Sequence, residues 1–392
     1  MISTKARFRI LISLVTISGF SQGMLLPLLA IILEQSHVSS AINGLHATGL
    51  YIGVLIASPF MEKPLKKLGY KPIILIGGSL VIVSLAFFPL WHALWFWFIL
   101  RLLVGIGDHM LHFATQTWIT STSTPEHRGR NIAYYGLFFS LGFSMGPMMT
   151  RLLSINESLP FLVASGLCFF VWIFMFFVRN EWTDTEEVDV GATTSLGRFV
   201  KAWRLAWVAL LAPFAYGILE STLHGIFPIY GLRLGHQVDL LSFIIPCFSL
   251  ASLITQIPLG ILSDKIGRKN VLSFVISLGI ATFVLSSLLE ESVIWLFITF
   301  SLAGMFIGSL YSLGVSFMAD LLPKTLLPAG NIMCGIAFSL GSITGPYIGG
   351  SFIEAFPNVS FFYVVVFMLV VILVAILFKR TEQTPNPQTG HS

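Results

Sequence analysis

The sequence predicts an all-α membrane protein with 12 transmembrane helices in two pseudo-symmetric six-helix bundles. Three observations lead to this fold class: the composition, the number of long apolar stretches and an internal repeat. Hydrophobic residues make up 55% of the 392 positions and charged residues only 10%, whereas a soluble domain carries roughly 25% charged residues. A surface this poor in charge is stable in lipid rather than in water.

Twelve apolar stretches are long enough to cross a bilayer, which requires about 20 residues of helix. Because backbone groups in lipid must bond within the protein, and because the stretches show no two-residue alternation, they are predicted to be helices rather than barrel strands. The predicted spans cover residues 10–33, 42–61, 72–90, 94–120, 132–153, 161–178, 205–231, 240–262, 270–289, 292–320, 331–355 and 360–378.

The two halves of the chain repeat each other. Residues 139–147 read FSLGFSMGP and residues 338–346 read FSLGSITGP, with a shift of 199. We therefore expect an N-terminal bundle (1–178), a cytoplasmic linker (179–204), a C-terminal bundle (205–380) and a disordered tail (381–392). The linker is expected to end in a short basic surface helix. Duplicated membrane halves are typical of transporters whose binding site lies between the halves.

Basic residues set the expected orientation. With the N-terminus inside, 19 of the 22 Lys and Arg residues fall in cytoplasmic segments, and only Arg151 and Arg233 lie on the opposite side. This asymmetry predicts a multi-pass protein of the cell membrane (plasma or inner) with both termini cytoplasmic. The net charge of +4 then reflects topology, not nucleic-acid binding. Acids near the opposite boundary are expected to be solvated: Glu34, Glu157, Asp239, Glu290, Glu291 and Glu354.

The loop between spans eight and nine carries the most specific motif. Residues 260–272 read GILSDKIGRKNVL, and this pattern resembles the signature loop of the major facilitator superfamily. The resemblance implies a gating role for Asp264, Gly267, Arg268 and Lys269. Glycine permits a tight turn and an acid can face a helix N-terminus, so the pattern is also physically reasonable.

The equivalent loop of the first half departs from this pattern. Residues 62–71 read EKPLKKLGYK, so Lys66 stands where the acid belongs. Glu62, one turn earlier, is the candidate replacement.

Spans five and eleven contain small residues at four-residue spacing followed by proline. Such spacing lets helices approach closely, and proline bends them. The pattern G-x-x-x-G-P-x-x-G-G is similar to the antiporter motif of facilitator-type drug exporters; it is complete in span eleven, but Thr150 and Arg151 replace its last two glycines in span five. The resemblance favours export and implies gating, whereas the alternative is a bent packing helix. The residues concerned are Gly142, Gly146, Pro147, Gly345 and Pro346.

Span four holds charges at membrane depth. Asp108, His112 and Gln116 fall within about 60° of Arg101 on a helical projection. Since an unpaired charge is costly there, these side chains are expected to face a watery cavity or each other, with a water bridging Arg101 and Asp108. A structural ion pair and a core histidine at His112 are the alternatives. The sequence R-x-x-x-G-x-G from Arg101 also resembles the family's arginine motif.

Span seven provides a second polar stripe of Tyr216, Glu220 and His224 at four-residue spacing. Glu220 lies near mid-membrane, where desolvation favours the neutral carboxyl group, so that it can take up and release a proton. We predict that Glu220, Asp108 and Arg101 couple transport to protons. The predicted substrate-binding residues are Arg101, His112, Gln116, Tyr216, Glu220, His224, Gln22 and His46.

The chain from residue 8 to 380 resembles the 12-span drug:proton antiporters of the major facilitator superfamily. This resemblance implies proton-coupled efflux of a small amphipathic or drug-like compound by alternating access. The alternatives are export of an anionic metabolite or a metal-chelating, siderophore-type compound, and proton-coupled import. The expected partners are the substrate, protons and lipid, and the protein is expected to be monomeric.

Enzymatic activity is not expected. Loops are short and no phosphate-binding loop is present, so direct ATP hydrolysis is unsupported. A membrane-embedded enzyme that binds a metal through Asp108, His109 and His112 remains as a contrasting hypothesis. We expect neither a metal nor another cofactor.

Overall fold

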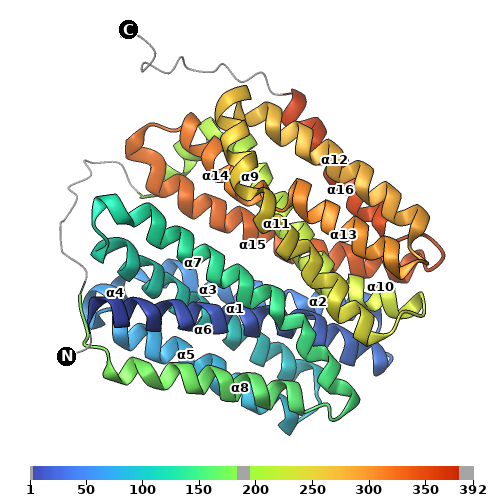
Figure 1. Ribbon diagram of the computed structural model, residues 1–392, viewed down its shortest axis with the longest axis horizontal. Coiled ribbons are helices and arrows are strands. Elements are labelled where there is room, and N and C mark those ends of the chain that lie inside the picture. Colours follow the sequence, from blue (N-terminus) through green and yellow to red (C-terminus); the bar gives the residue numbers. More distant parts are fainter. Residues whose placement is uncertain (1–2, 183–194, 379–392) are drawn as a thin grey trace.

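The computed structural model describes residues 3–182 and 195–378, and it forms two groups of helices (Figure 1). Ten helical stretches are long and apolar enough to cross a membrane, and α16 (Phe362–Phe378) is a shorter apolar helix. The fifth predicted span is α7 (Pro125–Met145), continued by the 3₁₀ helix η3 (Gly146–Ser154). The described residues contain no strand. The predicted all-α membrane fold with 12 spans is therefore confirmed.

The N-terminal helices, blue to green in Figure 1, pack as one group. Its elements are α1 (Thr4–Gln35), α2 (Ser40–Ala47), α3 (Gly49–Ala57), η1 (Ser58–Phe60), α4 (Glu62–Leu68), α5 (Tyr70–Phe87), η2 (Phe88–Leu90), α6 (Leu94–Thr122), α7, η3, α8 (Leu159–Trp172) and η4 (Ile173–Phe177). The predicted second span is thus divided between α2 and α3, and α4 is a short helix in the loop.

The C-terminal helices, yellow-green to red in Figure 1, form the second group. Its elements are α9 (Ser195–Gly225), α10 (Phe227–Arg233), α11 (Val238–Ile266), α12 (Arg268–Leu289), α13 (Val293–Ile307), α14 (Leu310–Leu321), η5 (Lys324–Leu326), α15 (Leu327–Ala355) and α16. The C-terminal bundle is predicted to begin at 205, and α9, which enters it, begins at Ser195. The basic end of the predicted linker is the first part of the seventh span, not a separate surface helix. The predicted tail, 381–392, lies outside the described residues.

Glycines at equivalent positions of the two halves make equivalent close contacts between helices. A Cβ at Gly105 would meet a backbone carbonyl of α3, and a Cβ at Gly304 would meet one of α11. Likewise, Gly142 lies against α1 and Gly341 against α9. Only a residue without a side chain lets these helices approach so closely. The sequence repeat is therefore also a repeat of packing.

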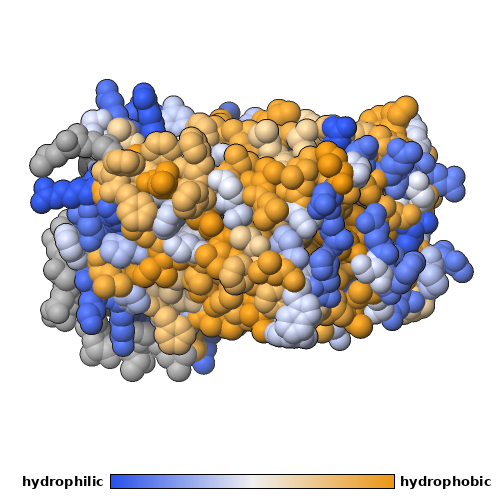
Figure 2. Space-filling view, turned by 90° about the horizontal axis from the view of Figure 1, so that it is seen from below, coloured by the Kyte–Doolittle hydropathy of each residue, from blue (hydrophilic) through white to orange (hydrophobic). Residues whose placement is uncertain are grey.

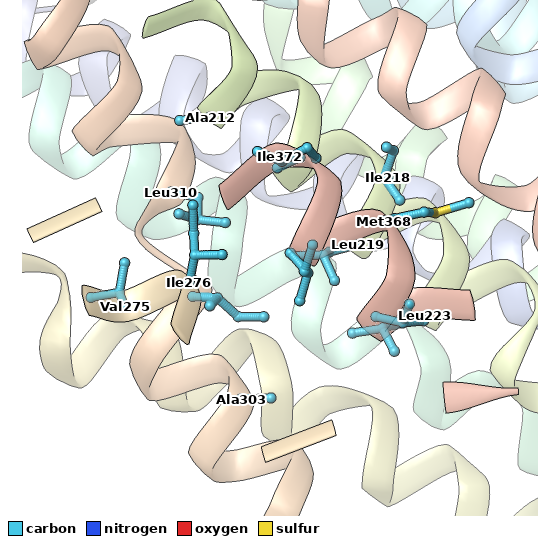
Figure 3. Close-up of a cluster of buried hydrophobic side chains, with 14 of the residues drawn as sticks. Ala212, Ile218, Leu219, Leu223, Val275, Ile276, Ala303, Leu310, Met368 and Ile372 are labelled. Atoms are coloured by element: carbon cyan, nitrogen blue, oxygen red, sulfur yellow. The ribbon is translucent and has the colours of Figure 1, made fainter. Parts of the chain in front are cut away.

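The surface is amphipathic along the helix direction. Figure 2 shows a broad apolar belt between two hydrophilic ends, as a protein that crosses a bilayer requires. The interior is apolar as well, and Figure 3 shows Ile218, Leu223, Ile276 and Met368 meeting in the core of the C-terminal bundle. Together with the ten long apolar helices, this belt identifies a multi-pass membrane protein.

The two ends of the molecule differ in charge and in how the halves meet. We call the end at which α1 begins, which also carries Lys66 and Lys265, the basic end, and the other the far end. At the far end Arg233 crosses from one half to the other, with Nε 2.8 Å from Oε1 of Glu34 and a guanidinium N–H donating to Ser40 Oγ at 2.6 Å.

Two further contacts join the halves at the far end. Arg151 Nε lies 3.1 Å from Asp239 Oδ1, and the backbone N–H of Ala41 donates to Glu354 Oε2 at 2.9 Å. Asp239 and Glu354 are exposed, as expected of solvated boundary acids, although both also bind the opposite half; the expectation is wrong for Glu34, whose side chain is only 16% exposed. All three acids bind the opposite half because α1, α11 and α15 all end or begin there.

A glycine seam seals the same end. A Cβ at Gly44 of α2 would meet the carbonyl of Pro346 in α15, and a Cβ at Gly350 of α15 would meet the carbonyl of Ser40. The two halves therefore touch backbone to backbone. We call Gly44, Gly350 and these two carbonyls the far-end seam.

Candidate functional site

Arg101 is fully buried in the N-terminal bundle and already has partners there. Its guanidinium lies 3.0 Å from Nδ1 of His46 and donates to the carbonyls of Leu25 and Leu26 at 3.1 and 3.5 Å. His46 in turn contacts the carbonyl of Leu94 through Nε2, at 3.1 Å. The Arg101 Nε atom is buried without a partner. Arg101 and His46 thus tie α6, α2 and α1 together.

Asp108 begins a chain of hydrogen bonds that crosses the N-terminal bundle. Its Oδ1 accepts from Ser18 Oγ at 2.5 Å, and the same hydroxyl lies 3.0 Å from Nε2 of His112. Nδ1 of His112 lies 2.6 Å from the hydroxyl of Tyr135 in α7. Each member can both accept and donate a proton in one of its forms. We call Tyr135, His112, Ser18 and Asp108 the polar chain.

Arg101 and Asp108 belong to separate sites. Asp108 is 1% exposed and faces a cavity of about 10 Å³ inside the bundle, lined in part by Leu14, Cys168 and Trp172. A cavity of this size holds about one water molecule. Oδ2 of Asp108 is buried without a partner in the described structure. The expected link between Asp108 and Arg101 gives way to separate contacts with α1, in which Asp108 bonds to Ser18 and Arg101 to the carbonyls of Leu25 and Leu26.

Glu220 lies where the two halves meet. The Tyr216 hydroxyl donates to its carboxylate, and Tyr51 of the N-terminal half lies near both Glu220 and Arg101. The ring of Tyr51 lies 6.2 Å from that of Phe338 in α15, measured between centroids. Glu220 is thus a buried acid of the C-terminal half that lies near a buried tyrosine of the N-terminal half.

Four aromatic rings form one cluster, which includes Tyr216 and Tyr51, the two tyrosines that interact with this carboxylate. The ring of Phe338 lies 6.1 Å from Tyr216 and 5.7 Å from Tyr311, and those two tyrosine rings are 6.4 Å apart. We call Tyr51, Tyr216, Tyr311 and Phe338 the aromatic cage. It is built from α3, α9, α14 and α15, so it draws on both halves.

Other predicted binding residues lie near these two centres. His224 is buried, donates from Nδ1 to the Glu220 carbonyl at 2.8 Å and contacts the ring of Phe143 at 4.7 Å between centroids. Gln22 lies 3.3 Å from Nε2 of His112 through its amide nitrogen. Gln116 is exposed.

The motif loop of the C-terminal half forms the expected turn. Gly267 has φ +93°, a conformation that favours glycine. Asp264 forms an ion pair with Arg268, which also contacts Asp320 at 3.2 Å. Lys269 donates to the carbonyl of Leu377 at 3.2 Å. These contacts join the basic ends of α11, α12, α14 and α16.

The residues of the glycine–proline motifs, which are predicted to gate, differ in whether they contact their own half or the opposite half. Gly142 and Gly146 pack against α1, and Gly345 packs against α9, so each lies against its own half. Pro147 lies in the first turn of η3, just after the α-helical part of the fifth span ends. The carbonyl of Pro346, by contrast, forms part of the far-end seam.

Sequence reasoning missed several residues of the site. Ser18, Tyr51, Tyr135, Tyr311 and Phe338 are common residue types in apolar spans, and their roles depend on contacts between distant helices. The metal hypothesis finds no support in the described ranges, where no group of three His, Cys, Asp or Glu side chains is placed to hold an ion.

Known proteins resemble this chain over its whole length. The family model described as Major Facilitator Superfamily matches residues 11–237 and 209–392. An uncharacterized MFS-type transporter of Bacillus subtilis (strain 168), YfkF, is 49% identical over 389 residues, covering 99% of each chain. A second one, YcaD of Escherichia coli O6:K15:H31 (strain 536 / UPEC), is 22% identical and covers 91% of each chain.

Solved structures share the fold at low sequence identity. The nucleoside transporter NupG gives a TM-score of 0.76 at 14% identity, covering 95% of this chain and 100% of that one. A bacterial homolog of the human lysosomal transporter Spinster, in an inward-facing and unoccupied conformation, gives 0.69 at 16% identity, covering 96% and 95%. With the family model matching both halves and a 49% identical relative of full length, the chain belongs to the major facilitator superfamily of transporters.

Proposed function

We propose that this transporter exports a small lipophilic organic cation in exchange for protons. In this proposal the basic end faces the cytoplasm, as the distribution of Lys and Arg favours, and the sealed far end faces outward. The observation that carries the proposal is a buried carboxylate, Glu220, that accepts a hydrogen bond from Tyr216 of the aromatic cage at the junction of the halves.

The chemistry of the cage fits a cation. Aromatic faces attract organic cations by about 0.5–2 kcal/mol per ring, most strongly where water is excluded. A carboxylate in the same place adds the opposite charge, whereas the flat rings tolerate ligands of different shape. Such a site selects charge and apolar area more than a particular hydrogen-bond pattern.

Proton exchange follows from competition for the same carboxylate. Protonated Glu220 has no charge to offer a cation, so proton binding and substrate binding exclude one another. The polar chain provides a second proton site at Asp108. The other end of this chain, Tyr135, lies in α7, which leads into η3. We expect Arg101 to hold the structure of the N-terminal site and to tune its charge.

An anionic or metal-chelating cargo fits the buried polar residues less well. Its natural partner would be Arg101, but that guanidinium is fully buried and bonded to His46 and to two carbonyls of α1. An anion could reach the guanidinium only by breaking these buried hydrogen bonds, and each polar partner left without one costs about 1–3 kcal/mol. Export rather than import is favoured by the complete glycine–proline motif of α15.

Transport in proteoliposomes tests the proposal. We expect radiolabelled tetraphenylphosphonium to accumulate inside vesicles whose lumen is acidic. The protein molecules whose basic end faces outward should carry out this uptake. Addition of a protonophore should abolish it. Uptake of a tricarboxylate chelate instead of the cation, or transport of the cation together with protons in the same direction, would contradict the proposal.

The aromatic cage gives a prediction about affinity. Replacing Phe338 by Ala should weaken tetraphenylphosphonium binding about tenfold, because one cation–π contact and its buried area are lost. Isothermal titration in detergent measures it. The matched control is Phe170→Ala, since Phe170 is 62% exposed on α8 and should leave binding unchanged. Equal effects of the two changes would argue against the cage.

The polar chain gives a prediction about rate. Ser18→Ala removes the hydroxyl that links His112 to Asp108, and we expect proton-driven transport to slow about tenfold, the effect of one lost buried hydrogen bond. Cation binding at equilibrium should not change. Ser21→Ala is the control, because Ser21 is also buried in α1 but its hydroxyl donates to the backbone carbonyl of Ser18 and is not part of the polar chain. A loss of binding with no loss of rate would contradict the relay.

A further inference from the structure

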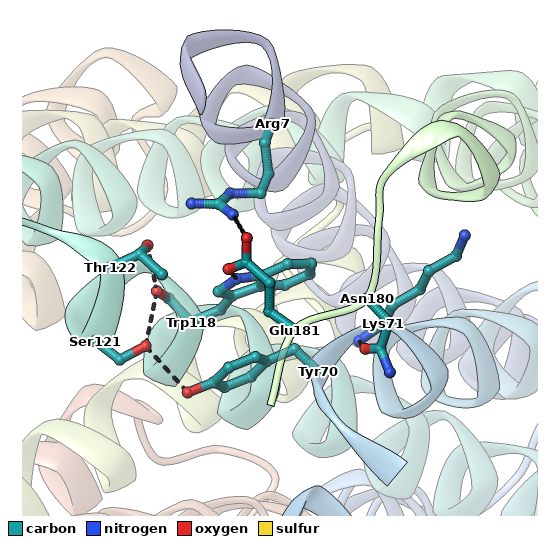
Figure 4. A network of polar contacts seen from close by, with 8 residues as sticks. All are labelled: Arg7, Tyr70, Lys71, Trp118, Ser121, Thr122, Asn180 and Glu181. Atoms are coloured by element: carbon teal, nitrogen blue, oxygen red, sulfur yellow. Dashed lines mark hydrogen bonds and ion pairs between the residues drawn. The ribbon is translucent and has the colours of Figure 1, made fainter. Parts of the chain in front are cut away.

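The basic end of the N-terminal half is completed by residues that follow the sixth span. Glu181 forms an ion pair with Arg7 of α1, and its Oε2 accepts from Nε1 of Trp118 in α6 at 2.7 Å. Arg7 also lies over the Trp118 ring, 5.3 Å from its centroid. Figure 4 shows Glu181 between these two side chains.

The same segment caps the start of α5. The backbone N–H of Tyr70 donates to the Glu181 carbonyl at 3.0 Å, and that of Lys71 donates to Oδ1 of Asn180 at 3.0 Å. The Asn180 amide donates to the carbonyl of Leu68 at 2.8 Å. The first amides of a helix need acceptors, and Gly69 offers no side chain. Asn180 and Glu181 therefore supply a cap from another part of the chain.

The repeat explains why this cap is needed. In the C-terminal half the basic end is held by Asp264, Arg268 and Asp320. The positions equivalent to Arg268 and Asp320 in the first half are Tyr70 and Ser121, whose hydroxyls lie 3.0 Å apart. In the first half, the uncharged contact between Tyr70 and Ser121 thus stands in place of the ion pair between Arg268 and Asp320. Lys66 stands in place of Asp264. The side chain of Glu62, the replacement expected from the sequence, lies outside the described part.

We infer that Glu181 is the missing acid of the first half, and that it holds the basic ends of α1, α5 and α6 together as one body. A fully buried Trp118 would otherwise have an N–H without an acceptor. A Cβ at Gly69 would meet Asn180 and Glu181, so this glycine serves the docked segment as well as the turn. Glu181 is a positioning residue, because it keeps the basic ends of these helices in place when the halves move. The inference depends on the rocking movement of the family but not on the proposed substrate.

Hydrogen exchange of the purified protein in nanodiscs tests the docking. In Glu181→Gln the amides of Tyr70 and Lys71 should exchange about tenfold faster, because release of the segment removes their acceptors. Asn180→Ala should do the same at Lys71. Exchanging the charges, Arg7→Glu with Glu181→Arg, should restore part of the protection that either change alone removes. Unchanged exchange in Glu181→Gln and Asn180→Ala, or no restoration by the exchange of charges, would overturn the inference.

Spin-label distances separate positioning from general stability. Labels at Arg9 and Lys67, both exposed at the basic end, should show a broader distance distribution in Glu181→Gln. Labels at Gln35 and Trp91, exposed at the far end, should keep theirs. The control variant is Glu157→Gln, an exposed acid whose partner is His92. Broadening at both ends, or at neither, would show that Glu181 does not position the basic end.

Discussion

Replacing Glu220 by Gln is expected to slow transport driven by a pH gradient at least about 100-fold, because this is the usual effect of removing a group that transfers protons. Glutamine keeps the shape and can still bond to the Tyr216 hydroxyl, so the fold should survive. It can neither bind a proton nor attract a cation by charge. The measurement is uptake of tetraphenylphosphonium into proteoliposomes with and without an imposed pH difference.

The same variant separates coupling from binding. We expect Glu220→Gln to behave at every pH as the protonated wild-type protein does, with weak cation binding that no longer depends on pH. Asp108→Asn should slow proton-driven transport but leave cation binding at equilibrium largely intact, because Asp108 lies in the polar chain and not in the cage. Glu157→Gln is the control for a surface acid. Retention of full pH-driven transport in the double variant Glu220→Gln, Asp108→Asn would end the proposal.

The fold was predictable because the signals that determine it are local. Apolar length identifies the spans, and glycine with a positive φ marks the turns at Gly69 and Gly267. The repeat predicted two halves, and equivalent glycines such as Gly105 and Gly304 do pack alike. Boundaries were less certain: the start of α9 lies in a mixed basic and apolar segment, where a surface helix and a span have similar composition.

The polar site was predictable only in part. Asp108 and Glu220 are recognisable from sequence because an acid in the middle of an apolar span is rare. Their partners are not, since Ser18 and Tyr51 contact them from helices distant in the chain. A helical projection put Arg101 and Asp108 on one face, but it carries no information about which neighbouring helix covers each part of that face. The contacts with α1 and α2 decide their separation.

The two ends of the molecule differ in whether their contacts join the two halves. At the far end they are joined by a seam without side chains and by three bridging acids. At the basic end, the contacts of Asp264 and of Glu181 each stay within one half. Opening the far end therefore requires separating two backbones and several charged contacts together, whereas each half keeps its own basic end intact. This arrangement fits rocking of rigid bundles better than bending of single helices.

The far-end seam gives the second large effect. Replacing Gly44 by Leu should prevent the far end from closing, because even a Cβ there would meet the Pro346 carbonyl. Overpacking of a tight contact costs about 1–3 kcal/mol, which shifts the balance between the two states about 5- to 150-fold. We expect transport to be lost and the far end to stay open. Ala47→Cys, in a background without the native cysteines, should react faster with an impermeant maleimide added at the far side.

Matched glycines distinguish a blocked seam from a damaged fold. Gly166→Leu should have little effect, because nothing lies within 4 Å of a Cβ built at Gly166. Gly142→Leu should lower thermal stability, since it forces α7 away from α1 within one half, without making Ala47→Cys more accessible in the molecules that remain folded. Gly350→Leu, across the seam, should reproduce Gly44→Leu. If Gly44→Leu transported normally, or if its labelling rate matched that of Gly166→Leu, then closure of the seam would not be a step of the transport cycle.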